Sequence, residues 1–269
     1  MKIKGKVLVT GGAGLVGSRL VRALVRQGCK VRVLDTRYGE LGDETVGTNL
    51  EFIGIGGDSL RGGIADKRVV EESVQGVDVV FHLAINWDGA SWTHELPLAS
   101  LFDVNVRGTL NLLETAKAHG TKHFIFSSSA AVYGQTERTI ALKHGAREER
   151  VDEESACRPE LWDGDPGPAY AILKMTTEKL CLMYYHHYDL PVTVFRVEYV
   201  FVGEKELGDH ANIHVDDVVS ALTLAALNKK TYGQVFNLAY PTSYISTMKL
   251  QRTLNWKPNA TINFLRSAI

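Results

Sequence analysis

Tyr170 and Lys174 are the pair in this sequence best suited to acid–base chemistry. They lie four positions apart in a segment that predicts a helix, so both side chains lie on the same helix face. A phenol is a poor base near neutral pH because its ordinary pKa is about 10. A neighbouring ammonium favours the phenolate and so lowers that pKa. The pair therefore predicts a base that removes the proton of a substrate hydroxyl.

Ser129 is the third predicted catalytic residue. It follows residues 123–127 (HFIFS), which predict a strand. Open α/β sheets bind their ligands at the carboxyl ends of such strands. We expect the Ser129 hydroxyl to hydrogen-bond the oxygen on which Tyr170 acts. A Tyr-x-x-x-Lys pair alone is common on helix surfaces, so its significance depends on the elements around it.

Residues 6–20 predict a strand, a tight glycine-rich turn and a helix. Such a turn needs glycine for positive φ, for close approach of the backbone to a pyrophosphate, and for helix–strand packing. The helix N-terminus that follows offers unpaired N–H groups to phosphate. The segment therefore predicts a dinucleotide site. The cofactor-binding residues expected in it are Gly11, Gly14, Leu15, Val16 and Gly17.

Asp35 indicates which dinucleotide binds. It closes the next apolar strand, where a carboxylate can accept hydrogen bonds from the adenosine ribose hydroxyls. Arg37 could instead reach a 2′-phosphate, but Asp35 would repel that group. We therefore expect NAD, with NADP as the alternative. With NAD as the hydride acceptor, Tyr170 would remove the proton of a substrate hydroxyl while hydride leaves the carbon that bears this hydroxyl.

Strand and helix patterns alternate along the chain, which predicts a Rossmann-type α/β fold with a doubly wound parallel sheet. Further strands are expected at 31–35, 50–55, 78–84, 123–127, 191–197 and 233–238, and helices at 99–119, 169–187 and 215–227. We expect residues 1–240 to form the dinucleotide-binding domain, interrupted by 135–169 and 201–213. Those two segments and the irregular tail 241–269 are expected to form a small substrate-binding lobe. Segment 135–169, which is polar and contains proline and glycine, is expected to be a lid or a flexible loop.

The composition excludes several classes of function. The 269 residues include 30 Lys and Arg against 31 Asp and Glu, with no basic block, so no nucleic-acid partner is expected. No apolar run approaches membrane-spanning length and no signal peptide precedes the first strand, so we expect a cytoplasmic protein without a membrane contact. The cysteines lie far apart and predict thiols in a reducing compartment. No metal is expected, although His210 and His214 are four residues apart.

Several motifs together resemble the extended short-chain dehydrogenase/reductase family, also called NAD-dependent epimerases/dehydratases. They are 10–17 (TGGAGLVG), 57–58 (GD), 78–84 (DVVFHLA), 105–109 (NVRGT), 126–134 (FSSSAAVYG), Tyr170 with Lys174, and 214–218 (HVDDV). The resemblance spans residues 5 to about 240. It implies further cofactor contacts at Asp58, Ser59, Leu83, Ala84, Asn105 and Ser127, and from Tyr170 and Lys174 as well.

Departures from the family pattern narrow the expected reaction. Dehydratases of the family carry Asp-Glu where this chain has Ala130 and Ala131, so dehydration is not expected. Sugar-nucleotide epimerases carry a long insert after the strand expected at 191–197, and here that insert is short. This compactness is similar to the uronate dehydrogenase branch, which matches an arginine at Arg196, although the sequence after Ser129 is epimerase-like. Ser129 and Arg196 are therefore the expected substrate-binding residues.

These features predict an NAD-dependent oxidoreductase that transfers hydride at a hydroxyl or carbonyl carbon of a small sugar, sugar acid or polyol. The alternative is a sugar-nucleotide 4-epimerase of the UDP-hexose type, which returns the hydride to its substrate. A non-catalytic dinucleotide-binding scaffold is the third hypothesis, and the Ser-Tyr-Lys set argues against it.

The helices at 99–119 and 169–187 carry apolar residues on more than one side, among them Phe102, Val106 and Leu113. Surplus apolar surface of this kind predicts a homodimer built on the two helices.

Overall fold

The computed structural model of the chain describes residues 3–41, 49–57, 61–86, 98–136, 139–140, 150–163, 167–202, 212–240 and 243–259. Within these ranges, a seven-stranded parallel sheet has the strand order β3-β2-β1-β4-β5-β6-β9. Its strands are β1 (Lys6–Thr10), β2 (Lys30–Leu34), β3 (Leu50–Ile53), β4 (Val79–His82), β5 (His123–Ser129), β6 (Val192–Val197) and β9 (Gln234–Leu238). The predicted doubly wound α/β fold is confirmed.

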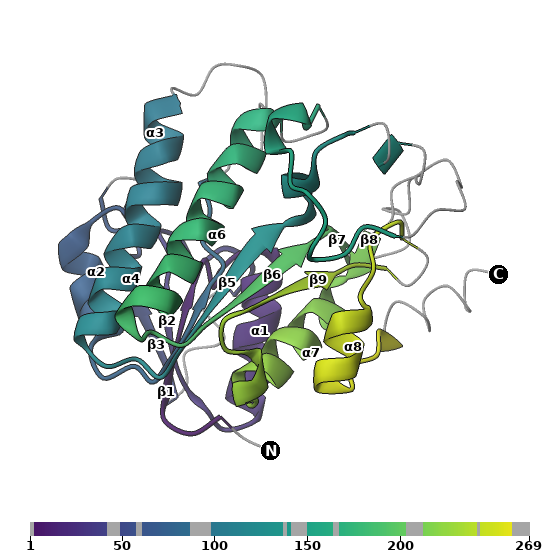
Figure 1. Cartoon of the computed structure of the whole chain (residues 1–269). Coiled ribbons are helices and arrows are strands. Elements are labelled where there is room, and N and C mark those ends of the chain that lie inside the picture. The colour runs from purple at the N-terminus through teal and green to yellow at the C-terminus, as the bar shows by residue number, and fades with distance from the viewer. Residues whose placement is uncertain are drawn as a thin grey trace.

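A helical layer covers each face of the sheet (Figure 1). One layer contains α2 (Lys67–Val74), α4 (Gly108–Ala118) and α6 (Pro168–Tyr188), and the other contains α1 (Leu15–Arg26), α7 (Val215–Ala226) and α8 (Met248–Leu254). Short 3-10 helices lie at Gly39–Leu41, Ala130–Tyr133, Pro159–Leu161 and Lys229–Thr231. None of the helices in the described ranges is both long and apolar enough to cross a membrane.

Each face of the sheet has its own hydrophobic core, because successive strand side chains point to opposite faces. Along β1, Val7 and Val9 belong to the core under α1 and α7, whereas Leu8 belongs to the core under α4 and α6. All three side chains are fully buried. The unbroken apolar run in the sequence therefore corresponds to a strand that is covered on both sides.

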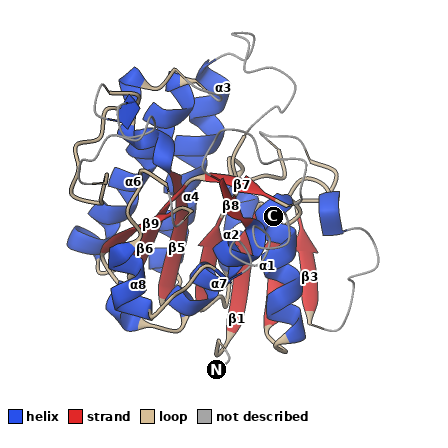
Figure 2. Cartoon of the chain, turned by 90° about the vertical axis from the view of Figure 1, so that its right-hand side faces the viewer, coloured by secondary structure: helices blue, strands red, loops and turns tan. Residues whose placement is uncertain are grey.

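A second, two-stranded parallel sheet pairs β7 (Tyr199–Phe201) with β8 (Asn212–His214). Because β7 comes almost directly after β6, this sheet lies at the end where the strands of the large sheet finish (Figure 2). The tail at 241–269, which was expected to be irregular, is only partly irregular. It contains α8, and the buried Trp256 after α8 donates from its indole Nε1 to the Ser220 hydroxyl at 2.9 Å.

The helix expected at 99–119 is interrupted. The described chain forms α3 (Leu98–Phe102), then a π-helical turn at Asp103–Arg107, and then α4. The backbone N–H of Gly108 bonds to the carbonyl of Asp103, five residues back, which is the π-helical pattern. Such turns widen the helix by one residue and occur frequently at functional sites.

Candidate active site

The carboxyl ends of the parallel strands bring most of the predicted site residues to one edge of the sheet. From β1 the chain passes to β2 and β3 on one side, and from β4 to β5 and β6 on the other, so the topology switches between β1 and β4. In open α/β sheets the ligand crevice lies at that switch. The predicted residues that follow or end these strands are Gly11, Asp35, Leu83, Ala84, Ser127 and Ser129.

The turn after β1 has the shape of a phosphate cradle. Gly11 has φ of +66°, and a Cβ atom there would lie 2.7 Å from the backbone of Ala84. A Cβ atom at Gly17 would overlap the carbonyl oxygen of Gly11. Gly14 begins α1 without a side-chain cap, and the first turn of α1, which contains Leu15 and Val16, carries no acidic side chain. The N–H groups there are therefore oriented to bind an anion, and the turn fits the pyrophosphate of a dinucleotide.

Asp35 is hydrogen-bonded to this same turn. Its Oδ2 accepts from the backbone N–H of Ala13 at 3.0 Å, and its Oδ1 accepts from that of Arg37 at 3.4 Å. The carboxylate thus lies beside the glycine turn, as a ligand of the adenosine ribose would require. Asp58 and Ser59, which were also expected to contact the cofactor, lie outside the described residues.

Ser129, Tyr170 and Lys174 come together at the ends of β5 and α6. Ser129 precedes a short 3-10 helix, and its Oγ accepts from the N–H of Ala131 at 3.2 Å. Its hydroxyl is also hydrogen-bonded to the Tyr170 side chain. Lys174 donates from Nζ to the carbonyl of Ser127 at 2.7 Å, and Nζ lies 5.7 Å from the centroid of the Tyr170 ring. Because Ser129 Oγ accepts from Ala131, its own proton can be donated to Tyr170 Oη.

Burial controls the electrostatics of this group. Desolvation raises the pKa of Tyr170, and the hydrogen bond from Ser129 partly opposes that rise. Desolvation lowers the pKa of Lys174 to about 8. At neutral pH, Lys174 therefore still carries most of its charge, and the Tyr170 phenol is protonated in the chain alone. The phenolate needs a further positive charge nearby, and the ring of an oxidised nicotinamide cofactor would supply it.

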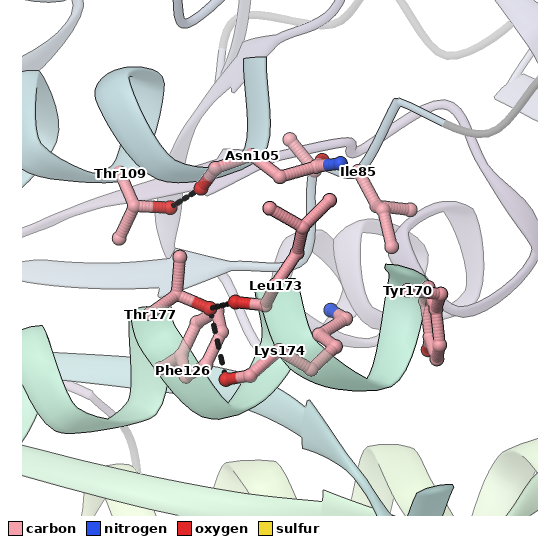
Figure 3. A pocket seen from close by; sticks show the side chains of 9 residues that line it. Ile85, Asn105, Thr109, Phe126, Tyr170, Leu173, Lys174 and Thr177 are labelled. Carbon is pink, nitrogen blue, oxygen red and sulfur yellow. Dashed lines mark hydrogen bonds between the residues drawn. The ribbon is translucent and has the colours of Figure 1, made fainter. Parts of the chain in front are cut away.

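Asn105 lies in the π-helical turn and faces the same group (Figure 3). Its Oδ1 accepts from the backbone N–H of Asn86 at 2.8 Å. Asn105, Tyr170, Lys174 and Ala84 are among the residues that line a cavity of about 10 Å³. That volume is about the space that one water molecule needs. We expected Asn105 to contact the cofactor from the helix at 99–119, but the sequence did not predict the π-helical turn that carries it.

Arg196 is placed differently from the expectation. The side chain is 4% exposed, and its guanidinium donates to both carboxylate oxygens of the fully buried Glu178, at 3.1 Å and 2.7 Å. It also donates to the Tyr133 hydroxyl at 2.9 Å and to the Glu153 carbonyl at 3.3 Å. These partners occupy the donors that a substrate carboxylate would use. The structure therefore assigns Arg196 to a buried ion pair, and we do not propose it as a substrate ligand.

The two alanines that replace the acid–base pair of dehydratases are buried in the 3-10 helix after Ser129, at 5% exposure for Ala130 and 4% for Ala131. Among the described residues, no three His, Cys, Asp or Glu side chains gather as metal ligands would. His210 lies outside the described residues, so its spacing to His214 is not tested.

The parallel sheet with a glycine turn after β1 is a Rossmann-type α/β fold. More particularly, the chain belongs to the NAD dependent epimerase/dehydratase family, which matches residues 7–212. The family resemblance predicted from the motifs is thus confirmed, and so is NAD as the cofactor.

Known proteins similar to this chain carry several activities. A UDP-N-acetyl-alpha-D-glucosaminuronate decarboxylase of Bacillus cytotoxicus is 30% identical over 266 aligned positions, which cover 88% of this chain and 75% of that protein. An uncharacterized UDP-glucose epimerase of Bacillus subtilis is 29% identical, over 77% of this chain and 60% of its own length. The solved structure of a mutated uronate dehydrogenase is 27% identical, has a TM-score of 0.75 and aligns over 98% of this chain and 85% of its own.

Proposed function

We propose that this chain is an NAD-dependent oxidoreductase that transfers hydride at a hydroxyl or carbonyl carbon of a small sugar, sugar acid or polyol. The observation that carries the proposal is the contact of Ser129 with Tyr170, beside Lys174, at the same sheet edge as the glycine turn. This arrangement brings a proton acceptor to the place where a dinucleotide held by the turn would receive the hydride.

Each of the three side chains has a distinct role in the proposal. Tyr170 Oη takes the proton of the substrate hydroxyl, and in the reverse direction it returns that proton. Ser129 Oγ, held by the Ala131 N–H, donates to the reacting oxygen and keeps it within reach of Tyr170. Lys174 is fixed by the Ser127 carbonyl and favours the phenolate through its charge. When NAD is bound, it accepts the hydride from the substrate carbon.

The cofactor contacts proposed for this chain begin with the glycine turn and Asp35. The phosphates would bind at the N-terminus of α1 and the adenosine ribose at Asp35, which favours NAD over NADP because Asp35 would repel a 2′-phosphate. The other proposed contacts are Leu83, Ala84, Asn105, Ser127, Tyr170 and Lys174, with Asp58 and Ser59 outside the described residues.

A 4-epimerase acting on a UDP-hexose is the second candidate. The same three side chains would remove a proton and then return it after the hydride has come back to the other face of the sugar. Similarity to a UDP-glucose epimerase favours this reading. The engagement of Arg196 by Glu178 also favours it, since that arginine was the residue matched to sugar-acid oxidation.

A product analysis distinguishes the two reactions. The purified chain is incubated with free sugars, uronic acids, polyols and UDP-hexoses, each with NAD and with NADP, and the absorbance of the reduced cofactor is followed. A dehydrogenase releases one reduced cofactor for each substrate oxidised. An epimerase instead converts a UDP-hexose without release. If the chain binds NAD but neither reaction occurs, the scaffold hypothesis replaces both. The Tyr170→Phe chain supplies the background rate for every substrate.

The substrate lobe is proposed to form where residues 150–163 meet residues 243–245. Val151 bridges to Ile245, and the Tyr133 hydroxyl donates to the Asp152 carbonyl at 2.9 Å. A small separate hydrophobic cluster lies beneath this contact, made of Ala130, Val132, Tyr133, Val151, Ala239 and Ile245. We propose that this cluster anchors the lobe to residues 1–240, with 201–213 completing it.

A cytoplasmic location is also proposed. All three cysteines lie in the described chain and none forms a disulfide, which suits a reducing compartment.

A homodimer built on the layer of α3, α4 and α6 is also proposed. Val106 and Leu113, which were expected to face outward, are buried within the chain. Among the apolar side chains that do reach the surface there are Leu98, Phe102 and Ile172, at 67%, 50% and 43% exposure. Exposed apolar side chains on helices of the same layer favour an interface between copies.

Sedimentation velocity tests this assembly. We expect a dimer at micromolar concentration that dissociates in the double variant Phe102→Glu and Ile172→Glu, because each charge would be buried without a partner. Leu224→Glu, at a 38% exposed position in α7 on the opposite layer, is the matched control and should remain dimeric. A monomer at every concentration, or a dimer that survives the double variant, contradicts the proposal.

A further inference from the structure

His82, the last residue of β4, is almost completely buried and takes no part in the proton transfer proposed above. Its two ring nitrogens each lie 2.8 Å from a threonine hydroxyl. Nδ1 meets Thr10 Oγ1 at the end of β1, and Nε2 meets Thr109 Oγ1 in α4. Both threonines are buried as well. The ring therefore connects the strand that carries the glycine turn to the helix that follows the π-helical turn.

The hydrogen-bond partners fix where the protons lie. The Thr109 hydroxyl donates to the backbone carbonyl of Asn105, which can only accept. Its single proton is thereby used, so its oxygen must accept from His82, and Nε2 must carry a hydrogen. On the other side, Thr10 Oγ1 accepts from the N–H of Ala84 at 3.2 Å and lies 2.8 Å from His82 Nδ1. When the hydrogen of the neutral ring is on Nε2, Nδ1 can only accept, so the Thr10 hydroxyl donates to it. One unbroken chain of hydrogen bonds thus runs from Ala84 to Asn105.

The ring is neutral in this arrangement. Burial, together with the positive charge of Lys174, lowers the pKa of His82 to about 3. A second ring proton would also face the proton that Thr10 already donates to Nδ1. The directions of the hydrogen bonds therefore do not change over the pH range in which the chain would work.

The two ends of the chain of hydrogen bonds face one cavity. Ala84, Asn105 and Lys174 all line it. The ring of His82 packs against that of Phe126, with 5.5 Å between centroids, and Lys174 Nζ lies 5.2 Å from the same Phe126 ring. A shift of His82 would therefore move the backbone of Ala84, the π-helical turn and the surroundings of Lys174 together.

We propose that neutral His82 is a positioning residue that holds Ala84 and Asn105 at a fixed separation on either side of Lys174. The inference rests on the proposed function in one respect, since Ala84 and Asn105 are taken to face the cofactor and the reacting centre. The Thr10 arm then acts on NAD binding through Ala84. The Thr109 arm acts chiefly on turnover through Asn105, although Asn105 is also one of the proposed cofactor contacts.

Nitrogen-15 NMR of the His-labelled, full-length chain tests the proton positions without any substrate. The expected spectrum shows one ring with a protonated Nε2 and an unprotonated Nδ1 that does not titrate between neutral and mildly acidic pH. That ring is assigned by its loss in His82→Gln. If the ring assigned to His82 instead carries its hydrogen on Nδ1, or is doubly protonated, the proposal is overturned, whatever reaction the chain catalyses.

Four single variants separate the two arms. Thr10→Val and His82→Gln, whose amide can still reach Thr109, should weaken NAD binding more than they lower kcat. Thr109→Val and His82→Asn, which can still accept from Thr10, should lower kcat more than they weaken NAD binding. The loss of one neutral hydrogen bond predicts a change of roughly fivefold in each case. Proportional losses in both quantities in all four variants would indicate a purely structural role and overturn the inference.

The threonine variants keep the test decisive if the His82 variants do not fold. Titration of NAD by intrinsic fluorescence needs no turnover, so the Thr10→Val and Thr109→Val chains can be compared even if no substrate is found. NAD binding weakened equally in both, or in neither, contradicts the proposal. A wild-type chain that binds NAD but turns over no substrate contradicts the proposed function instead, and it leaves the tautomer and the NAD titrations to decide the role of His82.

Discussion

Replacing Tyr170 with phenylalanine is expected to lower kcat by about 10²–10⁴-fold, the range that general acid–base catalysis contributes. The variant removes only the hydroxyl that exchanges the proton and keeps the ring. NAD affinity is expected to stay nearly the same, because the variant removes one hydroxyl and leaves the glycine turn and Asp35, which lie on other elements. Steady-state kinetics on the best substrate from the screen gives kcat, and fluorescence titration gives the affinity.

Tyr232→Phe is the matched control for this prediction. Tyr232 directly precedes Gly233 and β9, so it lies at the amino edge of the sheet, opposite the proposed site. Loss of its hydroxyl should leave kcat unchanged. If the Tyr170→Phe chain retains most of its kcat, Tyr170 is not the base. If its NAD affinity falls in parallel with kcat, the hydroxyl acts in binding rather than in proton transfer.

Arg196→Met is expected to destabilise the chain by about 3–5 kcal/mol, because it leaves the buried Glu178 carboxylate without its counter-charge. Glu178→Met should have an effect of similar size, since it strands the guanidinium. Replacing both with methionine removes both charges and should destabilise the chain far less than either single change. Urea unfolding followed by fluorescence and circular dichroism measures the three free energies of unfolding.

The control for this cycle is Arg158→Met. Arg158 pairs with Glu160 at 2.6 Å, but both side chains are about half exposed, so its removal should change stability by about 0–1 kcal/mol. The same variants also decide between two roles for Arg196. If it binds a substrate carboxylate, Arg196→Met raises KM and leaves the free energy of unfolding nearly unchanged. That outcome would make Arg196 a substrate ligand, favour a sugar acid among the proposed substrates and contradict the structural role of the buried ion pair.

The features that the sequence predicted well are those with a local physical cause. A strand buried on both faces must be apolar throughout, so the runs at 31–35 and 191–197 predicted β2 and β6 to within one residue. The glycine turn after β1 could be predicted, because a Cβ atom at Gly17 would overlap the carbonyl oxygen of Gly11 and only glycine fits there. The helix expected at 169–187 differs from α6 by one residue at each end.

Features that depend on distant partners were not predicted. The π-helical turn around Asn105 was not predicted, because the pattern of residues 99–119 indicates one continuous helix. The ion pair of Arg196 did leave a signal. Tyr170, Lys174 and Glu178 follow one another at intervals of four residues, so all three lie on the same face of α6. Since Tyr170 and Lys174 were expected to face the site, Glu178 could be expected on the buried face. A lone carboxylate buried there needs a cation. The helix α2 was missed too, although Asp66 caps its first turn by accepting from the Arg68 N–H.

The contacts of residues 151–153 have a consequence for how the chain folds as it is made. Val151 bridges to Ile245, and the Glu153 carboxylate accepts from the backbone N–H of Asn237 at 2.7 Å. A ribosome delivers these partners more than 80 residues after the segment they hold. Domains generally begin to fold from the N-terminus during synthesis. The nascent chain would therefore complete the glycine turn, β5 and α6 first, and residues 151–153 would dock only after β9 and the residues beyond it emerge.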